Sequence, residues 1–357
     1  MLKTGVLLLN LGTTQSPSYW HVFRFLREFL TDGRVIDLPF FIRSLLVYGL
    51  ILPFRPFKVM HAYKTIWTKN GSPFVIYHQS LLKQLRSLSP QTPIELGMRY
   101  GDLSIKKALD NLKKQGCNHL IVLPLFPQYA TASTGSAIAK LYTEIAQWWD
   151  PPTVDITLDF FDDEDFIDAQ SNLIKPLLQN NPIDAIIYSF HGVPVRHLQK
   201  SGCPNALNCQ ISACSIPDKS SRLCYKAQCK ETARLLHQAL NTDIPKEVAF
   251  QSRLGSIPWI KPYLDEALYE WHKLGYKNLL IVCPSFTVDC LETLEEIQLR
   301  FKEDWESLTG GTVITAPCVN DDRRWVMALG RWINQKLSPQ LLVNVESQEH
   351  SEIVSLQ

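Results

Sequence analysis

The sequence predicts an α/β fold with two similar doubly wound, Rossmann-like domains, each built on a parallel sheet. Short aliphatic runs alternate with amphipathic segments along the chain, which is the pattern of parallel sheets covered by helices. The chain has 357 residues and is 45% hydrophobic, so two domains of ordinary size can each bury a core. The order of these runs is similar in the two halves, which indicates a repeated topology.

Six runs are the predicted buried strands, three in each half. They cover residues 5–12, 94–101 and 119–126, then 184–192, 247–255 and 279–286. Ligands of such sheets bind beyond the carboxyl ends of the strands. We therefore expect the functional residues directly after these runs, in a cleft between the two domains.

The repeat is clearest in "GCNHLIVLPLFPQYATASTGSAIAKL" and "GYKNLLIVCPSFTVDCLETLEEIQL". Each has a glycine, a buried strand, Pro-x-Phe, a polar loop and a helix. We predict an N-terminal domain over 1–148, joined by a C-terminal helix over 321–338, and a C-terminal domain over 149–320. The second domain contains a cysteine-rich insertion over 201–224, and residues 339–357 form a polar tail that we expect to be flexible.

The charge balance and the N-terminus narrow the class of protein. Thirty-six basic and thirty-five acidic residues leave a formal charge of +1, which gives no overall attraction to nucleic acid. Asn10 and Gly12 interrupt the N-terminal apolar run, so it indicates a buried strand and not a signal peptide. We expect a cytoplasmic protein in a reducing compartment, where clustered cysteines more often bind metal than form disulfides.

The segment "LPFFIRSLLVYGLILPFRPF", residues 38–57, is the most apolar part of the chain. Arg43, Gly49 and prolines interrupt it before it reaches the ~18 apolar residues of a membrane span. Two interpretations stay open: an ordinary buried helix, or an apolar lip that touches an apolar ligand or a membrane surface. The second would place the protein peripherally on the inner face of the membrane.

His191 directly follows the apolar run "DAIIYSF", beside Gly192. An imidazole titrates near neutrality and binds borderline metals, so this position suits a proton acceptor or a metal ligand. A structural role is equally compatible with the pattern. His197 is a weaker candidate.

Glu292 lies in "PSFTVDCLETLEEI", the corresponding segment after another predicted strand. Asp289 could cap the helix there with Glu292 at the third position, close to a capping box. However, Glu292 and Glu296 are four residues apart on one helical face, where like charges repel. A row of carboxylates is better explained by a cation or protons that pass along it.

Polar and basic residues follow the other strands. The loop "PQYATASTGSA", residues 127–137, contains Tyr129 and Ser133 and offers hydroxyls and a helix N-terminus to an anionic group, although an ordinary helix cap explains it as well. Arg99 and Arg253 could bind carboxylates or form structural ion pairs.

Together, "LLLNLGT", "NGSPF", "GMRYG", "LPLFPQYATASTGSA", "SFHGVP", "FQSRLGSIPWIKPYLDEAL" and "CPSFTVDCLETLEEI" resemble bacterial ferrochelatase. The resemblance covers residues 5–337, with the motifs in the same order. It implies the two-domain chelatase fold and the last step of haem synthesis, in which Fe²⁺ enters protoporphyrin IX and two protons leave.

The resemblance also implies residue roles. His191 matches the family histidine that accepts pyrrole protons or handles metal, Glu292 the essential glutamate, and Glu296 the next acid on the same helix. His191 and Glu292 are thus the expected ligands of the Fe²⁺ substrate. With the loop above, the predicted porphyrin-binding residues are Leu11, Arg99, Tyr100, Tyr129, Ser133 and Trp259.

Two further features follow from the resemblance. Residues 38–57 are similar to the apolar lip around the porphyrin mouth, which in some members also meets the membrane. Cys290 stands where animal enzymes have histidine and proteobacterial ones commonly have cysteine, which leaves a metal-delivery role for this position open.

Other functions remain as alternatives. The porphyrin could be coproporphyrin III, or the protein could be a cobalt chelatase for a sirohaem-type precursor, although that class should lack the extended "FQSR" and "LETLEEI" matches. A non-catalytic haem or metal carrier, or a redox protein built on its cysteines, would bind without turnover. Monomer and homodimer are both compatible with the sequence.

Five of the nine cysteines lie within residues 201–229. Cys229 belongs to "YKAQC", a segment shared with the family, which leaves Cys203, Cys209, Cys214 and Cys224. Four thiolates can bind zinc or a 2Fe-2S cluster. The spacings contain no C-x2-C pair, which argues against the usual zinc sites, and some ferrochelatases carry a cluster. We expect a 2Fe-2S cluster, with zinc and free or disulfide-bonded thiols as alternatives.

Overall fold

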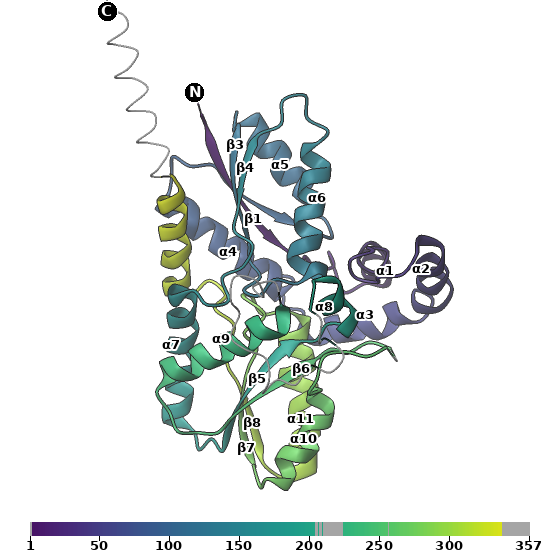
Figure 1. Cartoon of the computed structure of the whole chain (residues 1–357), viewed down its shortest axis with the longest axis vertical. Coiled ribbons are helices and arrows are strands. Elements are labelled where there is room, and N and C mark those ends of the chain that lie inside the picture. The colour runs from purple at the N-terminus through teal and green to yellow at the C-terminus, as the bar shows by residue number, and fades with distance from the viewer. Residues whose placement is uncertain (1, 204–205, 207–208, 210–223, 256, 338–357) are drawn as a thin grey trace, which may run out of the picture.

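Two four-stranded parallel sheets form the centre of the molecule (Figure 1). The structure is a computed structural model, and it describes residues 2–203, 206, 209, 224–255 and 257–337. The first sheet has the order β2-β1-β3-β4 and the second the order β6-β5-β7-β8. The strands are β1 (Thr4–Asn10), β2 (Ile94–Met98), β3 (His119–Pro124), β4 (Thr153–Ile156), β5 (Ala185–His191), β6 (Lys246–Gln251), β7 (Asn278–Val282) and β8 (Thr312–Thr315).

The two sheets have the same topology. In each sheet the first strand in chain order lies between the second and the third, and the fourth pairs with the third at the edge. This confirms the predicted pair of similar α/β units. All six predicted strands are present, but β4 and β8 were missed because these four-residue edge strands are largely exposed or half-buried. Since β4 pairs with β3, the first sheet extends past residue 148.

Helices cover both faces of each sheet. They are α1 (Tyr19–Leu30), α2 (Phe40–Leu46), α3 (Arg55–Ile66), α4 (Pro73–Leu88), α5 (Ile105–Lys114), α6 (Ser136–Ile145), α7 (Glu164–Asn180), α8 (Val195–Lys200), α9 (Tyr225–Leu240), α10 (Leu264–Lys273), α11 (Lys302–Thr309) and a last helix over 323–337. Three π-helical segments are η1 (Val47–Ile51), η2 (Thr131–Gly135) and η5 (Glu292–Phe301).

Alternate residues of β1 face two different cores, as the period of a strand requires. Val6 and Leu8 pack on the side of α4, while Leu7 and Leu9 pack against α5 and α6. The core on the α4 side is continuous with that of the second sheet, so the two domains share one apolar interior. The helix over 323–337 adds Trp325 to this shared core.

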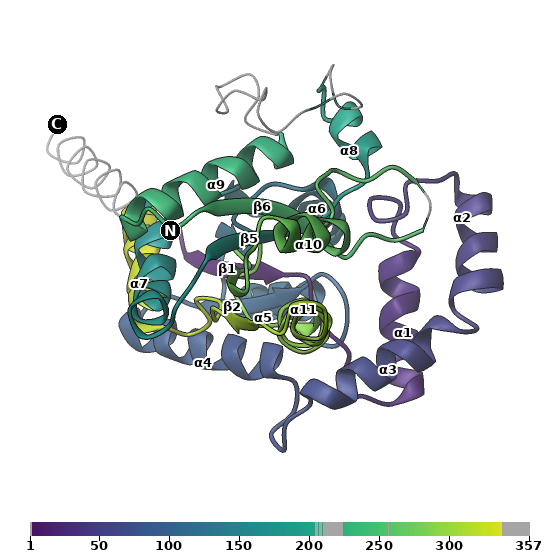
Figure 2. The same cartoon turned by 90° about the horizontal axis from the view of Figure 1, so that it is seen from below.

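Most of residues 38–57 are exposed, with Val47, Leu52 and Pro56 as the buried exceptions, so the interpretation as a buried helix is wrong. Helix α2 has no buried residue, and Phe41, Leu45 and Phe54 are 83%, 75% and 73% exposed. Helices α1, α2 and α3 project together from one side of the molecule (Figure 2). Among the described residues, no single helix is long and apolar enough to cross a membrane. Phe40–Ile51 and Arg55–Ile66 meet those criteria only as a pair, with a bend of 66° between them.

Candidate active site

His191 is the last residue of β5, and three hydrogen bonds fix it. Its Nδ1 lies 2.7 Å from the carbonyl oxygen of Gly192, its main-chain N–H donates to Ser285 Oγ at 3.1 Å, and its carbonyl accepts from the Tyr225 hydroxyl at 2.7 Å. A carbonyl can only accept, so Nδ1 carries the proton of the neutral imidazole. The basic lone pair is therefore on Nε2.

Glu296 is a half-buried carboxylate held by one residue of the neighbouring strand end. Ser252 donates to it twice, from its main-chain N–H at 3.0 Å and from its hydroxyl at 2.5 Å. Burial raises the pKa of Glu296; the Ser252 hydrogen bond and the charge of His191 oppose the increase, and Glu292 adds to it. Ser252 has a φ of 66°, a left-handed conformation that side chains other than glycine rarely adopt.

Glu292 and Glu296 lie on the π-helical segment η5, which begins at Glu292. The capping-box interpretation is wrong, because Leu291 is the N-cap and makes no side-chain cap hydrogen bond, while the two oxygens of Asp289 accept from other side chains. Thr293 donates to one at 2.9 Å and Asn320 to the other at 2.6 Å. π-Helical turns in proteins are frequently found at functional sites.

Tyr63, from α3 of the N-terminal half, was not predicted and lies close to Glu292. It is buried, accepts a hydrogen bond from the Thr13 hydroxyl at 3.2 Å, and has a pKa raised by burial and by the charge of Glu292. Its hydroxyl is therefore neutral and can serve as a donor. The segment "VMHAYKTI" contains no motif that sets this tyrosine apart from an ordinary core residue.

Cys290 is buried directly before this acidic helix. Burial raises the pKa of its thiol well above the usual range, and the charge of Glu292 and a hydrogen bond with Glu292 raise it further. A neutral thiol is a weak metal ligand, because the thiolate is the form that binds metal. The side chain is thus a neutral neighbour of Glu292.

Arg99 and Tyr100 form a separate network around Asp32. Arg99 Nη2 lies 2.5 Å and the Tyr100 hydroxyl 2.9 Å from Asp32 Oδ2, and Ser136 Oγ donates to the same oxygen. Burial would raise the pKa of Asp32, but hydrogen bonds from Ser136 and the Arg34 N–H and the charge of Arg99 lower it. The Arg99 guanidinium is therefore in a structural ion pair.

Arg253 is also paired. Its Nη2 lies 2.7 Å from Asp265 and its Nη1 2.8 Å from Glu266. Like Arg99, Arg253 is therefore in structural ion pairs.

Trp259 lies beside the histidine. A side chain in place of Gly192 would approach Trp259 Cε3 to 3.2 Å, and the indole N–H donates to the Leu254 carbonyl at 3.0 Å. The glycine after His191 thus leaves room for the indole. Leu11 is half-buried directly after β1, and its N–H donates to the side chain of Asn10 at 2.7 Å.

Tyr129 and Ser133 lie between β3 and α6, Tyr129 in a loop and Ser133 in the π-helical segment η2. The N–H of Tyr129 donates to Gln228 of the other domain at 2.6 Å, and the Ser133 hydroxyl faces the Ala130 carbonyl at 3.4 Å. Thus His191, Glu292, Glu296 and Trp259 belong to one centre, and Arg99 and Tyr100 to the Asp32 network. His197 is buried on α8.

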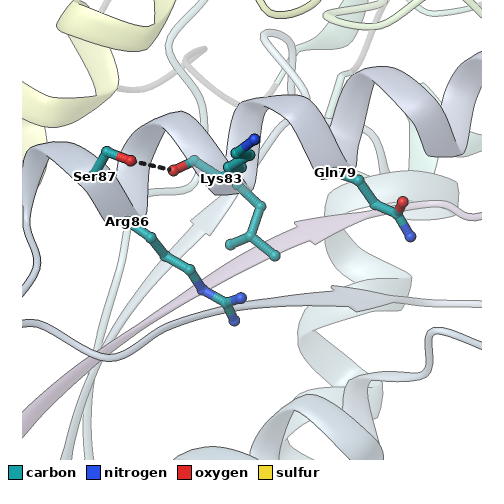
Figure 3. Close-up of a pocket in the computed structure, with 5 residues that line it drawn as sticks. Gln79, Lys83, Arg86 and Ser87 are labelled. Atoms are coloured by element: carbon teal, nitrogen blue, oxygen red, sulfur yellow. Dashed lines mark hydrogen bonds between the residues drawn. The ribbon is translucent and has the colours of Figure 1, made fainter.

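A separate hollow of about 500 Å³ lies along α4 (Figure 3). It is lined by Gln79, Leu82, Lys83, Arg86 and Ser87, with a hydrogen bond from Ser87 Oγ to the Lys83 carbonyl. It contains none of the predicted site residues, so we do not associate it with the chemistry of His191.

Three of the four candidate cluster cysteines are described, while Cys214 lies outside the described residues. Cys203, Cys209 and Cys224 are half-buried. Burial raises the pKa of Cys224, and Cys203 and Cys209 raise it further. Within the described ranges, no group of three or more His, Cys, Asp or Glu side chains is arranged to hold a metal ion.

Comparison with known proteins identifies the family. The family model for ferrochelatase matches residues 3–337. The chain belongs to the ferrochelatase family. A ferrochelatase of Legionella pneumophila (strain Corby) is 46% identical over 338 residues, which cover 94% of this chain and 100% of the relative. One of Coxiella burnetii (strain RSA 493 / Nine Mile phase I) is 44% identical over 337 residues, 94% of each chain.

The solved structures show the same fold at low sequence identity. SirB from Bacillus subtilis with Fe³⁺ has a TM-score of 0.54 at 12% identity and covers 94% of this chain and 95% of its own. The sirohydrochlorin chelatase SirB from Bacillus subtilis subspecies spizizenii, in complex with cobalt, has a TM-score of 0.51 at 13% identity, with 92% of each chain covered. The predicted chelatase fold is confirmed.

The ferrochelatase is thus an enzyme that inserts metal into a porphyrin, in the last step of haem biosynthesis. The predicted insertion of metal into a porphyrin is confirmed. The family does not agree with the alternatives of a cobalt chelatase, a carrier or a redox protein.

Proposed function

We propose that the enzyme inserts Fe²⁺ into protoporphyrin IX, with His191 as the acceptor of the pyrrole protons and Glu292 and Glu296 as a path for metal or protons. The observation that carries the proposal is the hydrogen bond from Nδ1 of His191 to Gly192, which leaves Nε2 as the basic nitrogen. The charge of the imidazole lowers the pKa of Glu296 on the acidic helix. A base and two carboxylates thus converge at the end of β5.

The reaction requires that two N–H protons leave as one divalent cation enters. A neutral imidazole accepts a proton on Nε2 and becomes a cation, which the nearby carboxylates stabilise. A half-buried carboxylate with a raised pKa, such as Glu296, takes up a proton more readily than an exposed one and can pass it on. His191 and Glu292 are the proposed ligands of the Fe²⁺ substrate before it reaches the macrocycle.

The apolar side chains near this centre suit a flat apolar substrate. Leu11 and Trp259 are the proposed contacts of the macrocycle, and Tyr129 and Ser133 of its carboxylates. Arg99 and Tyr100 are already bonded to Asp32, so we propose that they shape the wall of the site and do not bind a propionate directly.

Replacement of His191 tests the proton acceptor. His191→Ala should lower kcat for iron insertion by about 100-fold or more, since general-base catalysis contributes 10²–10⁴. His272→Ala, at an exposed position of α10, is the control and should keep full activity. Wild-type kcat in His191→Ala would remove His191 from the mechanism.

A substrate comparison tests the porphyrin. We expect a higher kcat/KM with protoporphyrin IX than with coproporphyrin III, which carries four propionates in place of two. The reverse order would assign the coproporphyrin alternative.

We also propose that Cys203, Cys209, Cys214 and Cys224 ligate a 2Fe-2S cluster. Support comes from the four thiols of one insertion and from the effect of Cys203 and Cys209 on the pKa of Cys224. When bound, such a cluster can take up one electron. Lys226, which is buried and donates to the Cys209 carbonyl at 2.8 Å, supplies a positive charge beside these thiols.

Analysis of anaerobically purified protein tests the cluster. We expect equal amounts of iron and sulfide and a visible absorption that bleaches on reduction. Cys214→Ser should abolish both, while Cys117→Ser, at a buried cysteine of the other domain, should not. Colourless protein that contains zinc would contradict the proposal.

We also propose that the enzyme is cytoplasmic and that its exposed lip binds peripherally to the inner face of a membrane. Residues 38–66 contain four basic residues, Arg43, Arg55, Lys58 and Lys64, and no acidic one. Exposed aromatic and aliphatic side chains beside positive charges are the combination that binds anionic bilayers.

A further inference from the structure

The main chain of His191 leaves the sheet at the point where one neighbouring strand has already ended. The pairing of β5 with β7 stops at Tyr188 and Val282, whereas the pairing with β6 continues to His191 and Gln251. The N–H and C=O of one strand residue point to the same side, and Gly192 N–H already bonds toward β6. The N–H and C=O of His191 therefore face the side where no strand remains.

Side chains replace the missing strand. Ser285, three residues after the end of β7, accepts from the His191 N–H at 3.1 Å, and Tyr225 donates to the His191 carbonyl at 2.7 Å. Tyr225 is the first residue of α9 and is only 6% exposed. Buried backbone groups need such partners, because an unpaired carbonyl costs as much as a lost hydrogen bond.

The two hydroxyls belong to one small network. Ser285 and the buried thiol of Cys229 both act on the Tyr225 hydroxyl, since Ser285 lowers its pKa and Cys229 raises it. Burial raises the pKa of Tyr225 well above its usual range, so its hydroxyl stays protonated and keeps its donor role. The network therefore holds the peptide of His191 against α9 and the loop after β7.

The position of the imidazole depends on this peptide. The bond from Nδ1 to the Gly192 carbonyl closes a short loop through the main chain of residues 191 and 192. If the His191 carbonyl loses its donor, only the bond from the Gly192 N–H to Gln251 still holds this peptide. The peptide can then tilt about that bond, the Gly192 carbonyl moves, and the proton is no longer confined to Nδ1. A change of tautomer would place a proton on the nitrogen that should accept one.

We propose that Tyr225 and Ser285 are positioning residues that hold His191 in the Nδ1–H tautomer with Nε2 free to accept a proton. This inference rests on the proposed role of His191. The inference also gives a role to the start of α9, because its first side chain, Tyr225, reaches the end of β5.

Tyr225→Phe removes the hydroxyl and keeps the ring. We expect kcat to fall roughly ten- to a hundredfold, with KM for porphyrin changed less than about twofold, because misplacement of a catalytic group by about an ångström costs up to 10² in rate. Tyr188→Phe is the matched control: this buried tyrosine is on the same strand, its hydroxyl has a contact of 3.5 Å with His237, and its removal should leave kcat unchanged.

The ¹⁵N spectrum of the histidines gives a measurement independent of activity. We expect the His191 signals, assigned with His191→Ala, to show the Nδ1–H tautomer in the wild type and a mixture of tautomers in Tyr225→Phe. Wild-type kcat together with a wild-type tautomer in Tyr225→Phe would overturn the inference. If His191→Ala remained active, the proposed function would fail, but the tautomer would still decide whether Tyr225 positions the ring.

Ser285→Ala tests the second contact and replaces Tyr225→Phe should that variant not fold. It should lower kcat in the same way, and Ser285→Thr, which keeps a hydroxyl, should restore most of the loss. Equal activity and equal ¹⁵N spectra in the wild type and Ser285→Ala would remove Ser285 from the inference.

Discussion

Ser252 shows how a single residue can set the protonation of an active-site carboxylate. Its N–H and hydroxyl both donate to Glu296, and its left-handed backbone directs both groups to the same side chain. The conformation costs of order 1–3 kcal/mol, which the surrounding structure must offset. Backbone strain of this kind clusters at functional sites.

Ser252→Ala should make Glu296 harder to ionise. Burial raises the pKa of Glu296 and the Ser252 hydroxyl lowers it, so loss of the hydroxyl should raise the pKa further. If the carboxylate form is required, the acid limb of the kcat–pH profile moves up by about one to two pH units, since a hydrogen bond to a charged group is worth ~1.5–3 kcal/mol. Ser171→Ala, which also removes a buried hydroxyl, is the control. An unchanged acid limb would show that Glu296 does not control the profile.

His78 couples the stability of the N-terminal half to pH. It is fully buried, its Nε2 lies 2.9 Å from the Asn10 side chain and its Nδ1 2.7 Å from the Phe74 carbonyl. Burial lowers its pKa from 6.5 to about 4, although the bond to Phe74 opposes the decrease.

The free energy of unfolding should therefore decrease as the pH falls from 6.5 to 4. Over this range the unfolded chain takes up a proton that folded His78 does not, which costs the folded state about 3 kcal/mol. Urea unfolding at several pH values should show this slope. His78→Gln should reduce it, and His272→Gln at an exposed position should keep it; equal slopes in wild type and His78→Gln would contradict the assignment.

Among the elements, α2 has the least usual surface for a helix of a globular domain. None of its seven residues is buried, and three of its neighbours in the chain are also exposed and apolar: Tyr48, Leu50 and Phe54. Apolar surface of this kind is stabilised when an apolar phase covers it.

Phe41→Ser combined with Leu45→Ser should weaken binding to vesicles that contain anionic phospholipid. The loss of two large apolar contacts, each worth ~1.5–3 kcal/mol when fully buried, should reduce the partition coefficient at least tenfold. Iron insertion into a water-soluble porphyrin should change little. Trp149→Ser, at a 94% exposed tryptophan far along the chain, is the control for general apolar adsorption. Equal binding of the double variant and the wild type would exclude the lip as the membrane contact.

At the scale of the molecule, buried amides join the two domains. Gln228 of α9 accepts from the Tyr129 N–H at 2.6 Å, and Gln128 donates to Thr232 at 3.0 Å and to the Pro284 carbonyl at 3.2 Å. These bonds fix the loop after β3 relative to the helix that reaches His191. The position of one half of the site relative to the other therefore depends on the hydrogen bonds of Gln128 and Gln228.

Gln228→Ala should leave the Tyr129 N–H without this acceptor inside the protein. The free energy of unfolding should fall by about 2 kcal/mol, the cost of an unsatisfied buried group. Gln238→Ala, at an exposed position of the same helix, should change it by less than about 0.5 kcal/mol. Chemical denaturation measures both, and equal stability of the two variants would show that the amide is not part of the interface.

The sequence by itself determined the local and repeated features. Aliphatic runs gave the six inner strands, because such strands are buried on both faces and have continuous apolar patterns. The motifs around His191 and Glu292 identified the family, because these side chains follow strand ends at fixed positions in the chain.

Only the tertiary structure decided what each side chain contacts. Arg99 and Asp32 are 67 residues apart and Tyr225 and His191 are 34 apart, so no local pattern could pair them. Only the tertiary structure showed the edge strands β4 and β8 and the exposure of the lip, because these features depend on which distant segments pack against them. Local sequence sets the backbone preference of each element, whereas burial and hydrogen bonding between distant segments select the partners of the functional groups.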